Sequence, residues 1–248
     1  MTKELDFSEP NERRYREFTG NSLEAMPLLI AEGRVPLSVK DIMERRLRSE
    51  NPVWMENYFD TGDAVACHPD GEIKIILDSE ILTRINPKSR IIRTYSNDDF
   101  TNGALIISED AYKKLKGPLI RTFKVEDLER NLSKYGRSFS SEEIKENPVW
   151  MFLARNDREL LRAYVDEVYE TGVEPGSNMD VDIREYGYSF NEKEERKLNK
   201  NFTKPPILMS FNIGGKRGHY GHYLHVSGFA HDSRFVGRLG KRKQGKIK

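Results

Sequence analysis

The sequence of 248 residues contains a single cysteine, Cys67. One cysteine excludes a disulfide bond within the chain and is typical of a reducing compartment, so we expect a cytoplasmic protein. No apolar run reaches the roughly 18 residues that a membrane-spanning helix needs, so no membrane partner is expected. The first residues also lack the apolar stretch of a secretory signal peptide.

The sequence also lacks the common catalytic motifs. It has no P-loop, no dinucleotide-binding glycine fingerprint, no HExxH and no GxSxG. These absences leave any reaction unspecified, and we predict no cofactor. Apolar residues make up 37% of the chain, charged residues 33% and aromatic residues 10%. Because the aromatic residues are spread along the chain, this composition predicts a folded protein with a modest core and a highly charged surface.

Positive charge is concentrated near the C-terminus. Residues 204–248 contain ten Lys or Arg and one acid, Asp232, which gives a net charge of +9. The whole chain carries only +1, so residues 1–203 sum to −8. The same C-terminal stretch holds four of the five histidines. A local basic field attracts phosphate groups whatever the overall charge, so this stretch is the main functional signal.

Helix signals are distributed over the first two thirds of the chain. Ser38 is placed to cap a helix, with Asp41 three residues later near the positive helix end. Ser108 is placed to cap a helix over residues 109–115. The clearest helix is 158–169, which has one apolar stripe and a charged opposite side.

Strand signals are also present. The turn His68-Pro69-Asp70-Gly71 lies between apolar runs at 64–67 and 72–77, which predicts a β-hairpin. Further strands are expected at 104–107 and, joined by glycine-rich turns, at 207–213, 223–229 and 234–239.

We therefore expect an α+β fold in two parts. Residues 1–20 are polar and are expected to lack regular structure, and Pro27 is expected to limit any helix in the apolar cluster that follows. The glycine- and proline-containing stretch after the 158–169 helix is the best linker candidate. The expected division is an acidic α+β domain at 1–172, a linker at 173–179, a small basic β-rich module at 180–240 and a basic flexible tail at 241–248.

The segment Glu-Asn-Pro-Val-Trp-Met occurs twice, at 50–55 and 146–151, and contains both tryptophans of the chain. A duplicated unit would imply two equivalent halves. The flanking sequences differ, however, which favours a reused local device in which Asn-Pro starts a helix and Trp anchors it in the core.

Two short motifs have a plain structural interpretation. Asp60-Thr61-Gly62 matches the active-site turn of aspartic proteases, but a second copy is absent and Asp63 replaces the usual small residue, so we interpret it as a turn. Cys67 and His68 are adjacent on a predicted strand. Their side chains therefore point to opposite faces and do not form a nucleophile–base pair.

The histidine-rich stretch has two alternative interpretations. Its spacing suggests a metal site, but a strand would separate His219 from His225 by roughly 20 Å. No metal is therefore predicted, and the weak candidate ligands are His222, His225, His231 and Asp232. The alternative is contact with a polyanion, since basic groups neutralise phosphate and aromatic rings stack on unpaired bases. The predicted nucleic-acid-binding residues are Lys216, Arg217, His219, Tyr220, His222, Arg234, Arg238, Lys241, Arg242 and Lys243.

Three stretches resemble a family of uncharacterised archaeal proteins. They are GRVPLSVKDIM, NYFDTGDAVACHPDGEIKI and GALIISEDAYKKL, which together span about residues 33–115. The family has no assigned function, so the resemblance implies only an intracellular microbial protein. The basic C-terminal part lies outside it.

Three functions remain open. The first is an accessory protein that binds DNA or RNA through its basic C-terminal hairpins and tail, mainly by contact with phosphate. The second is a hydrolase or phosphodiesterase, in which His219, His222, His225 or His231 acts as base or metal ligand beside Asp232. The third is an assembly module that self-associates through its acidic and basic halves.

Overall fold

The computed structural model describes residues 5–7, 12–78, 100–101, 104–124, 127, 140–170, 205–215, 224–227 and 232–239. Its strands are β1 (Tyr15–Asn21), β2 (Arg34–Pro36), β3 (Phe59–Cys67), β4 (Glu72–Ile76), β5 (Phe100–Thr101), β6 (Ala104–Ile106), β7 (Ile120–Lys124), β8 (Ile207–Ile213), β9 (Leu224–Ser227) and β10 (Asp232–Leu239). Its helices are α1 (Ser22–Ala31), α2 (Val39–Arg48), α3 (Val53–Glu56), α6 (Glu109–Lys114), α8 (Ser141–Lys145), α9 (Pro148–Leu153) and α10 (Arg158–Glu170). Within these residues, no helix is both long and apolar enough to span a bilayer.

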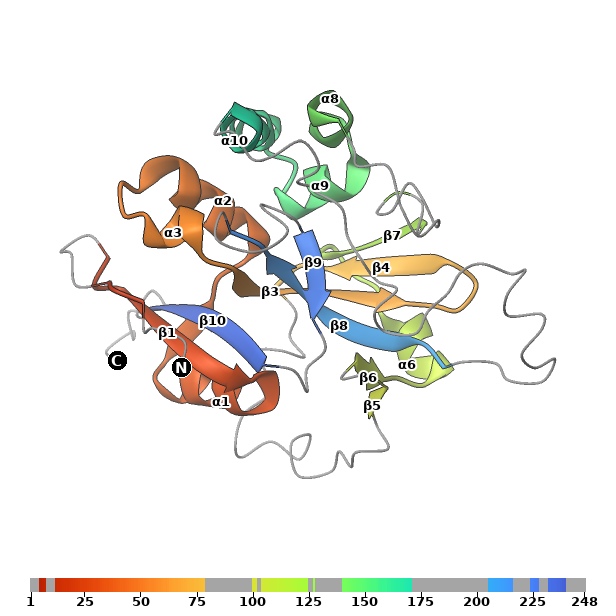
Figure 1. Cartoon of the computed structure of the whole chain (residues 1–248). Helices are drawn as coiled ribbons and strands as arrows, with labels where there is room; N and C mark the ends of the chain where they lie inside the picture. Colours follow the sequence, from red (N-terminus) through yellow and green to blue (C-terminus); the bar gives the residue numbers. More distant parts are fainter. Residues whose placement is uncertain are drawn as a thin grey trace, which may run out of the picture.

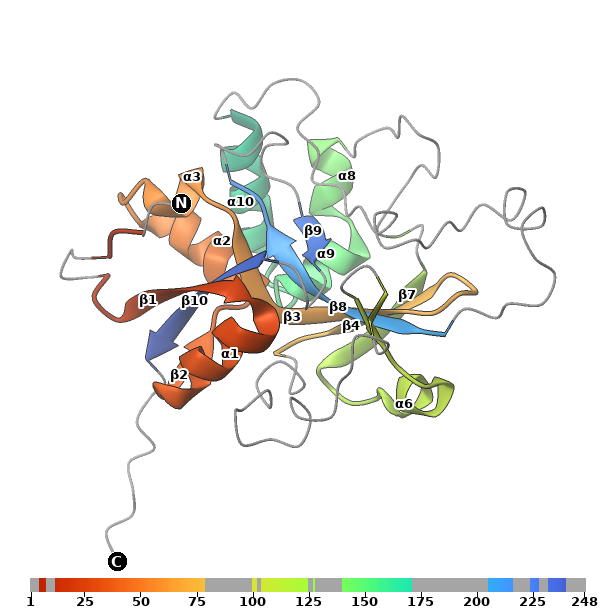
Figure 2. The same cartoon turned by 60° about the horizontal axis from the view of Figure 1, so that its bottom comes forward.

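The described strands form one mixed sheet with the order β1-β10-β3-β8-β6-β5. β2 pairs with the end of β10, β4 joins β3 to β7, and β9 pairs with β8. Helices cover both faces, so the sheet is the middle of three layers (Figures 1 and 2). α2, α3, α8, α9 and α10 lie on one face, and α1 and α6 lie on the other. The α+β class is therefore confirmed.

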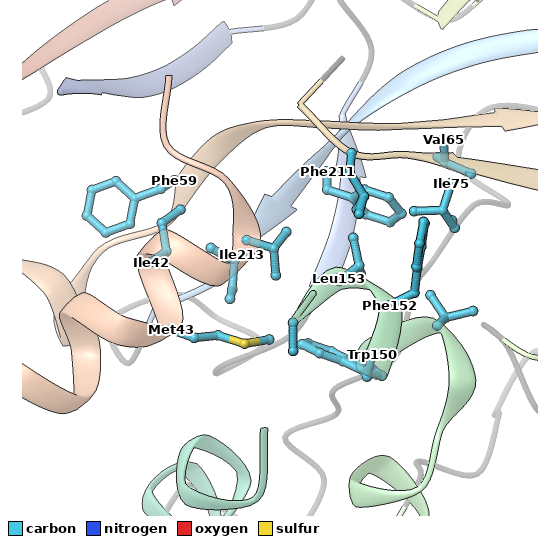
Figure 3. Close-up of a cluster of buried hydrophobic side chains, with 14 of the residues drawn as sticks. Ile42, Met43, Phe59, Val65, Ile75, Trp150, Phe152, Leu153, Phe211 and Ile213 are labelled. Atoms are coloured by element: carbon cyan, nitrogen blue, oxygen red, sulfur yellow. The ribbon is translucent and has the colours of Figure 1, made fainter. Parts of the chain in front are cut away.

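The larger core lies between the sheet and the five-helix layer. β3 is buried along its whole length, and its Phe59 and Val65 pack with Phe211 of β8 against the helices (Figure 3). Trp150 and Phe152 of α9 close this core from the helix side. A second, smaller cluster fills the opposite face under α1 and α6. Burial of these side chains supplies the main driving force for the layered arrangement.

Several predicted elements are confirmed with their caps. The side chain of Ser38 accepts a hydrogen bond from the Asp41 amide, and the Asp41 side chain accepts one from the Ser38 amide, which completes a capping box at α2. The hydroxyl of Ser108 caps α6 by accepting a hydrogen bond from the Ala111 amide. The hairpin turn joins β3 to β4 as expected, and β8 matches the predicted strand at 207–213.

The two copies of the repeated segment build the same local device. Asn51 accepts a hydrogen bond from the Val53 amide, and Asn147 accepts one from the Val149 amide. The tryptophan that follows each asparagine is buried in the larger core. The first copy leads into β3 and the second into α10. The repeat is thus a helix-start device, as the different flanks indicated.

Three expectations about the N-terminal part were wrong. Residues 15–21 form β1 instead of lacking regular structure, because they pair with β10. The local sequence gives no sign of this distant partner strand. α1 contains Pro27, which is buried within the helix instead of preventing it. Asp60-Thr61-Gly62 is not an isolated turn but part of β3, where the pairing with β8 shifts register between Asp60 and Ala64.

The topology also differs from the expected division at 172 and 180. β10, from the expected C-terminal module, lies between β1 and β3, and β8 lies between β3 and β6. In the described residues, strands from both expected parts therefore share one sheet and one core. Strand pairing joins residues more than 200 positions apart, which hydrophobic patterns along the chain do not reveal. The expected linker at 173–179 and tail at 241–248 lie outside the described residues.

Candidate functional site

The predicted contact residues fall mostly outside the described part of the chain. Arg234 and Arg238 are described and lie on β10. The others lie outside the described residues, and they are Lys216, Arg217, His219, Tyr220, His222, Lys241, Arg242 and Lys243.

Arg234 is buried and serves the interior of the sheet. Its Nε lies 2.8 Å from Oε1 of Glu17 on β1, and its Nη1 donates a 2.9 Å hydrogen bond to Oδ1 of Asn57. The guanidinium also lies over the ring of Tyr58. Its backbone amide donates to the buried carboxylate of Asp60 on β3. Arg234 thus ties β10 to both neighbouring strands, and a surface role for it is wrong in this structure.

Arg238 remains partly open to solvent. Its Nη1 lies 2.8 Å from Oδ1 of Asp41, and 40% of its side chain is exposed. Asp41 already caps the start of α2, so the same carboxylate joins the helix to β10. An exposed pair of this kind contributes little stability. Arg238 is therefore the one described member of the predicted set that has a solvent-facing charge.

The weak metal candidates are separated in the sheet. His225 of β9 is paired in register with Asn212 of β8, whereas Asp232 belongs to β10. β8 and β3 lie between these two strands, which corresponds to three strand spacings, or about 14 Å. His222 and His231 lie outside the described residues. Within the described ranges, no group of three or more His, Cys, Asp or Glu side chains is arranged to hold a metal ion.

A buried ion pair fixes the middle of the sheet to the helix layer. Asp63 of β3 is fully buried, and its Oδ1 accepts a 2.9 Å hydrogen bond from Nη2 of Arg155. The amides of Val39 and Asp78 donate to the same carboxylate at 2.8 and 2.9 Å. Burial raises the pKa of Asp63, while Arg155 and the two amides oppose that rise. Arg155 and Asn156 both adopt left-handed backbone conformations, with φ of +59° and +60°.

Arg46 makes a second buried brace. Its Nε donates to the carbonyl oxygen of Trp54 at 2.9 Å, and its Nη1 donates to the hydroxyl of Tyr164 at 2.6 Å. Its Nη2 donates to the carbonyl oxygens of Asn57 and Ile213. One side chain of α2 therefore satisfies oxygens from α3, α10 and the end of β8. This arrangement ties α2 to α3, α10 and β8.

The hairpin carries an ion-pair network instead of a nucleophile–base pair. Cys67 is buried in the larger core, where desolvation raises the pKa of its thiol to about 12. The ring of His68 instead packs at a tilt against the ring of Tyr112 of α6, with its Nδ1 2.7 Å from Asp70 and its Nε2 2.9 Å from Glu109. Desolvation lowers the pKa of His68, but the two carboxylates outweigh it and the pKa is raised. The expected separation of Cys67 from His68 is thus confirmed.

Comparison with known proteins establishes the fold. No protein-family model and no curated protein sequence matches the chain. In structure, the chain is similar to a solved structure whose description reads "Accommodation of massive sequence variation in Nanoarchaeota by the C-type lectin fold", with a TM-score of 0.57. Sequence identity is 14%, and the alignment covers 90% of this chain and 97% of that chain. The source of that structure agrees with an archaeal resemblance, whereas no family model supports a particular family.

Proposed function

We propose that the protein is a non-catalytic nucleic-acid-binding protein that contacts phosphate through its basic C-terminal residues. One observation carries the proposal, namely the net charge of +9 over residues 204–248 against −8 over the rest of the chain. Two of the ten basic residues, Arg234 and Arg238, face Glu17 and Asp41 from the N-terminal part. The other eight keep the C-terminal stretch strongly positive, which favours phosphate binding.

The described frame supports a binding role. Its buried charged groups form hydrogen bonds and ion pairs with each other and with backbone atoms, as at Asp63–Arg155 and around Arg46. Such groups stabilise a scaffold. The similar structure from Nanoarchaeota is described as accommodating massive sequence variation by the C-type lectin fold. By analogy, we infer that here the frame is fixed by its core while ligand contacts come from residues outside the core.

The test is a salt titration of binding. Fluorescence anisotropy would measure the affinity of the full chain for labelled single- and double-stranded DNA and RNA between 0.05 and 0.2 M salt. If five to eight phosphates are neutralised, the affinity should fall between about 10²- and 10⁴-fold over that range. Contacts confined to phosphate predict little preference for base sequence.

Two controls separate this function from the alternatives. A variant with Lys241→Gln, Arg242→Gln and Lys243→Gln should bind more weakly and show a flatter salt response. A second variant with Lys113→Gln, Lys114→Gln and Lys116→Gln, all exposed and near α6, has the same change in net charge and should bind as the wild type. Absence of binding at 0.05 M salt, or an affinity that does not change with salt, would contradict the proposal. Salt-sensitive self-association without binding would instead support an assembly module.

A further inference from the structure

β1 is the outer strand at one end of the described sheet (Figures 1 and 2). It pairs with β10 over all seven of its residues, from Tyr15 to Asn21, without a register shift. Within the described ranges, no strand pairs with the other side of β1. This side is therefore an open sheet edge, and an open edge is a template for a further strand.

The hydrogen-bond pattern identifies the main-chain groups that line the open edge. The Leu239 amide donates to the carbonyl oxygen of Arg14 at 3.1 Å, so position 14 faces β10. Because the direction alternates along an antiparallel strand, the even positions of β1 also face β10, whereas Glu17 and Thr19 face away. Glu17 is half-buried although only 6% of its side chain is exposed, so its exposed area lies mainly on the main chain. The amides and carbonyl groups of Glu17 and Thr19 thus line the open edge.

This edge lacks the features that usually prevent pairing. Native sheets protect their edges with lysine, proline or a β-bulge. β1 contains no Lys and no Pro, and its pairing with β10 is regular. The carboxylate of Glu17 is satisfied within the chain, since its Oε1 lies 2.8 Å from Nε of Arg234 and its Oε2 accepts a hydrogen bond from the Leu5 amide. It therefore does not repel an added strand.

A base and an acid lie on the same face of β1, at its two ends. The side chain of Arg16 is 59% exposed and pairs with Glu32, just after α1. Glu24, in the first turn of α1, is exposed, and its Oε2 lies 3.8 Å from the point where a Cβ of Gly20 would lie. Four strand residues, or roughly 13 Å, separate Arg16 from Gly20 in one chain. Glu24 makes no ion pair within the described residues.

We propose that the open edge of β1 binds β1 of a second copy of the chain, antiparallel and about a twofold axis at Phe18. This register is the one that pairs all seven residues of β1. It places Glu17 opposite Thr19 of the second copy, so their main-chain groups exchange hydrogen bonds. Twofold symmetry makes each of these contacts twice. The dimer does not depend on nucleic-acid binding.

The same register joins the unpaired acid to a base. It places Arg16 opposite Gly20 of the second copy, and directly opposed residues have Cβ positions about 5 Å apart. Because Gly20 has no side chain, the guanidinium of Arg16 can extend over it to Glu24 of the second copy. The two symmetric Arg16–Glu24 pairs favour this register. Such a dimer differs from one between the acidic and basic halves, because main-chain pairing supplies most of its affinity.

The test is sedimentation velocity of the full chain over a range of concentrations. Small interfaces are weak, so concentrations up to about 1 mM are needed. Arg16→Glu and Glu24→Lys should each raise the dimer dissociation constant at least about tenfold, because each creates two like-charge contacts. The variant that combines both changes exchanges the charges and should restore the wild-type constant. Glu159→Lys, exposed in the first turn of α10, is the matched control and should leave the constant unchanged.

A further variant addresses the main chain. The Thr19 N–H points away from β10, so Thr19→Pro removes a donor from the open edge without removing a hydrogen bond to β10, and it should abolish the dimer. Thermal melting of each variant identifies any that fails to fold. A measurement on the wild type alone avoids this difficulty, since hydrogen exchange at the Glu17 and Thr19 amides should slow as the concentration rises.

The outcomes separate this dimer from the proposed function. A wild type that stays monomeric at the highest concentration would contradict the dimer, and DNA binding by that monomer would leave the proposed function standing. A dimer that both charge reversals leave unchanged would lie at another surface and would also contradict the proposal. Loss of the dimer in each single variant with recovery in the combined variant supports pairing through β1.

Discussion

Replacing Arg155 by methionine should destabilise the protein strongly at neutral pH. The change removes the guanidinium that lies 2.9 Å from Oδ1 of Asp63 and leaves a fully buried carboxylate with two amide donors only. Removal of one member of a buried pair costs about 3 to 5 kcal/mol. For a chain of this size, that cost lowers Tm by about 6 to 20 °C.

The pH dependence gives this prediction a sign. Because burial raises the pKa of Asp63, the folded protein holds its proton more tightly than the unfolded chain does. Loss of Arg155 raises that pKa further, since the arginine opposes the rise. The cost of Arg155→Met should therefore be largest near pH 7 to 8 and shrink as the pH falls and Asp63 becomes protonated.

The assay is urea unfolding followed by fluorescence, since Trp54 and Trp150 are buried reporters in the core. Asp78→Asn is the matched control, because it removes only the exposed partner of Arg155 and should cost under about 1 kcal/mol. The double variant Asp63→Asn with Arg155→Met should be less destabilised than the sum of its single variants. A cost of less than about 1 kcal/mol for Arg155→Met at pH 7 would refute this account of the pair.

Two further predictions concern backbone packing and α6. Gly215→Ala should lower the free energy of unfolding, measured in urea, by about 3 kcal/mol or more. An added Cβ would lie 2.2 Å from the carbonyl oxygen of Asn57, and the atoms it would meet belong to the backbone, which cannot move aside as a flexible side chain could. The raised pKa of His68 means that its pairs with Asp70 and Glu109 stabilise the fold fully below its usual 6.5 and are lost as the pH rises through the folded pKa. In the wild type, Tm should therefore fall as the pH rises through the folded pKa of His68. In His68→Asn this fall of Tm should be absent, and a variant whose Tm depends on pH as the wild type's does would contradict the prediction.

Features set by neighbouring residues were predictable from the sequence. Ser38 with Asp41 marks the start of α2, and Asp70-Gly71 marks the hairpin turn, because capping and tight turns depend on a few adjacent residues. The apolar run at 207–213 predicted β8 with its observed bounds. The predicted surface role of Arg234 failed because its acidic partner, Glu17, is supplied by a strand more than 200 residues away.

Features set by strand pairing were not predictable from local patterns. β1 has the mixed sequence YREFTGN, without a clear strand pattern, and its pairing with β10 makes it a strand. The same pairing brings the backbone of Arg14 next to Leu239, a contact that patterns along the chain do not show. From the sequence, Arg155 looks like one of many surface charges. Its partner, Asp63, is 92 residues away, and no residue near Arg155 in the sequence indicates this pairing.

The measurement that tests the central claim most directly is the salt dependence of DNA binding by the full chain. The account predicts binding at 0.05 M salt and a steep linear fall of log K with log salt, with a slope close to −0.9 for each phosphate neutralised. It also predicts nearly equal affinity for duplexes of different sequence. No binding at low salt, or binding that is insensitive to salt, would contradict it.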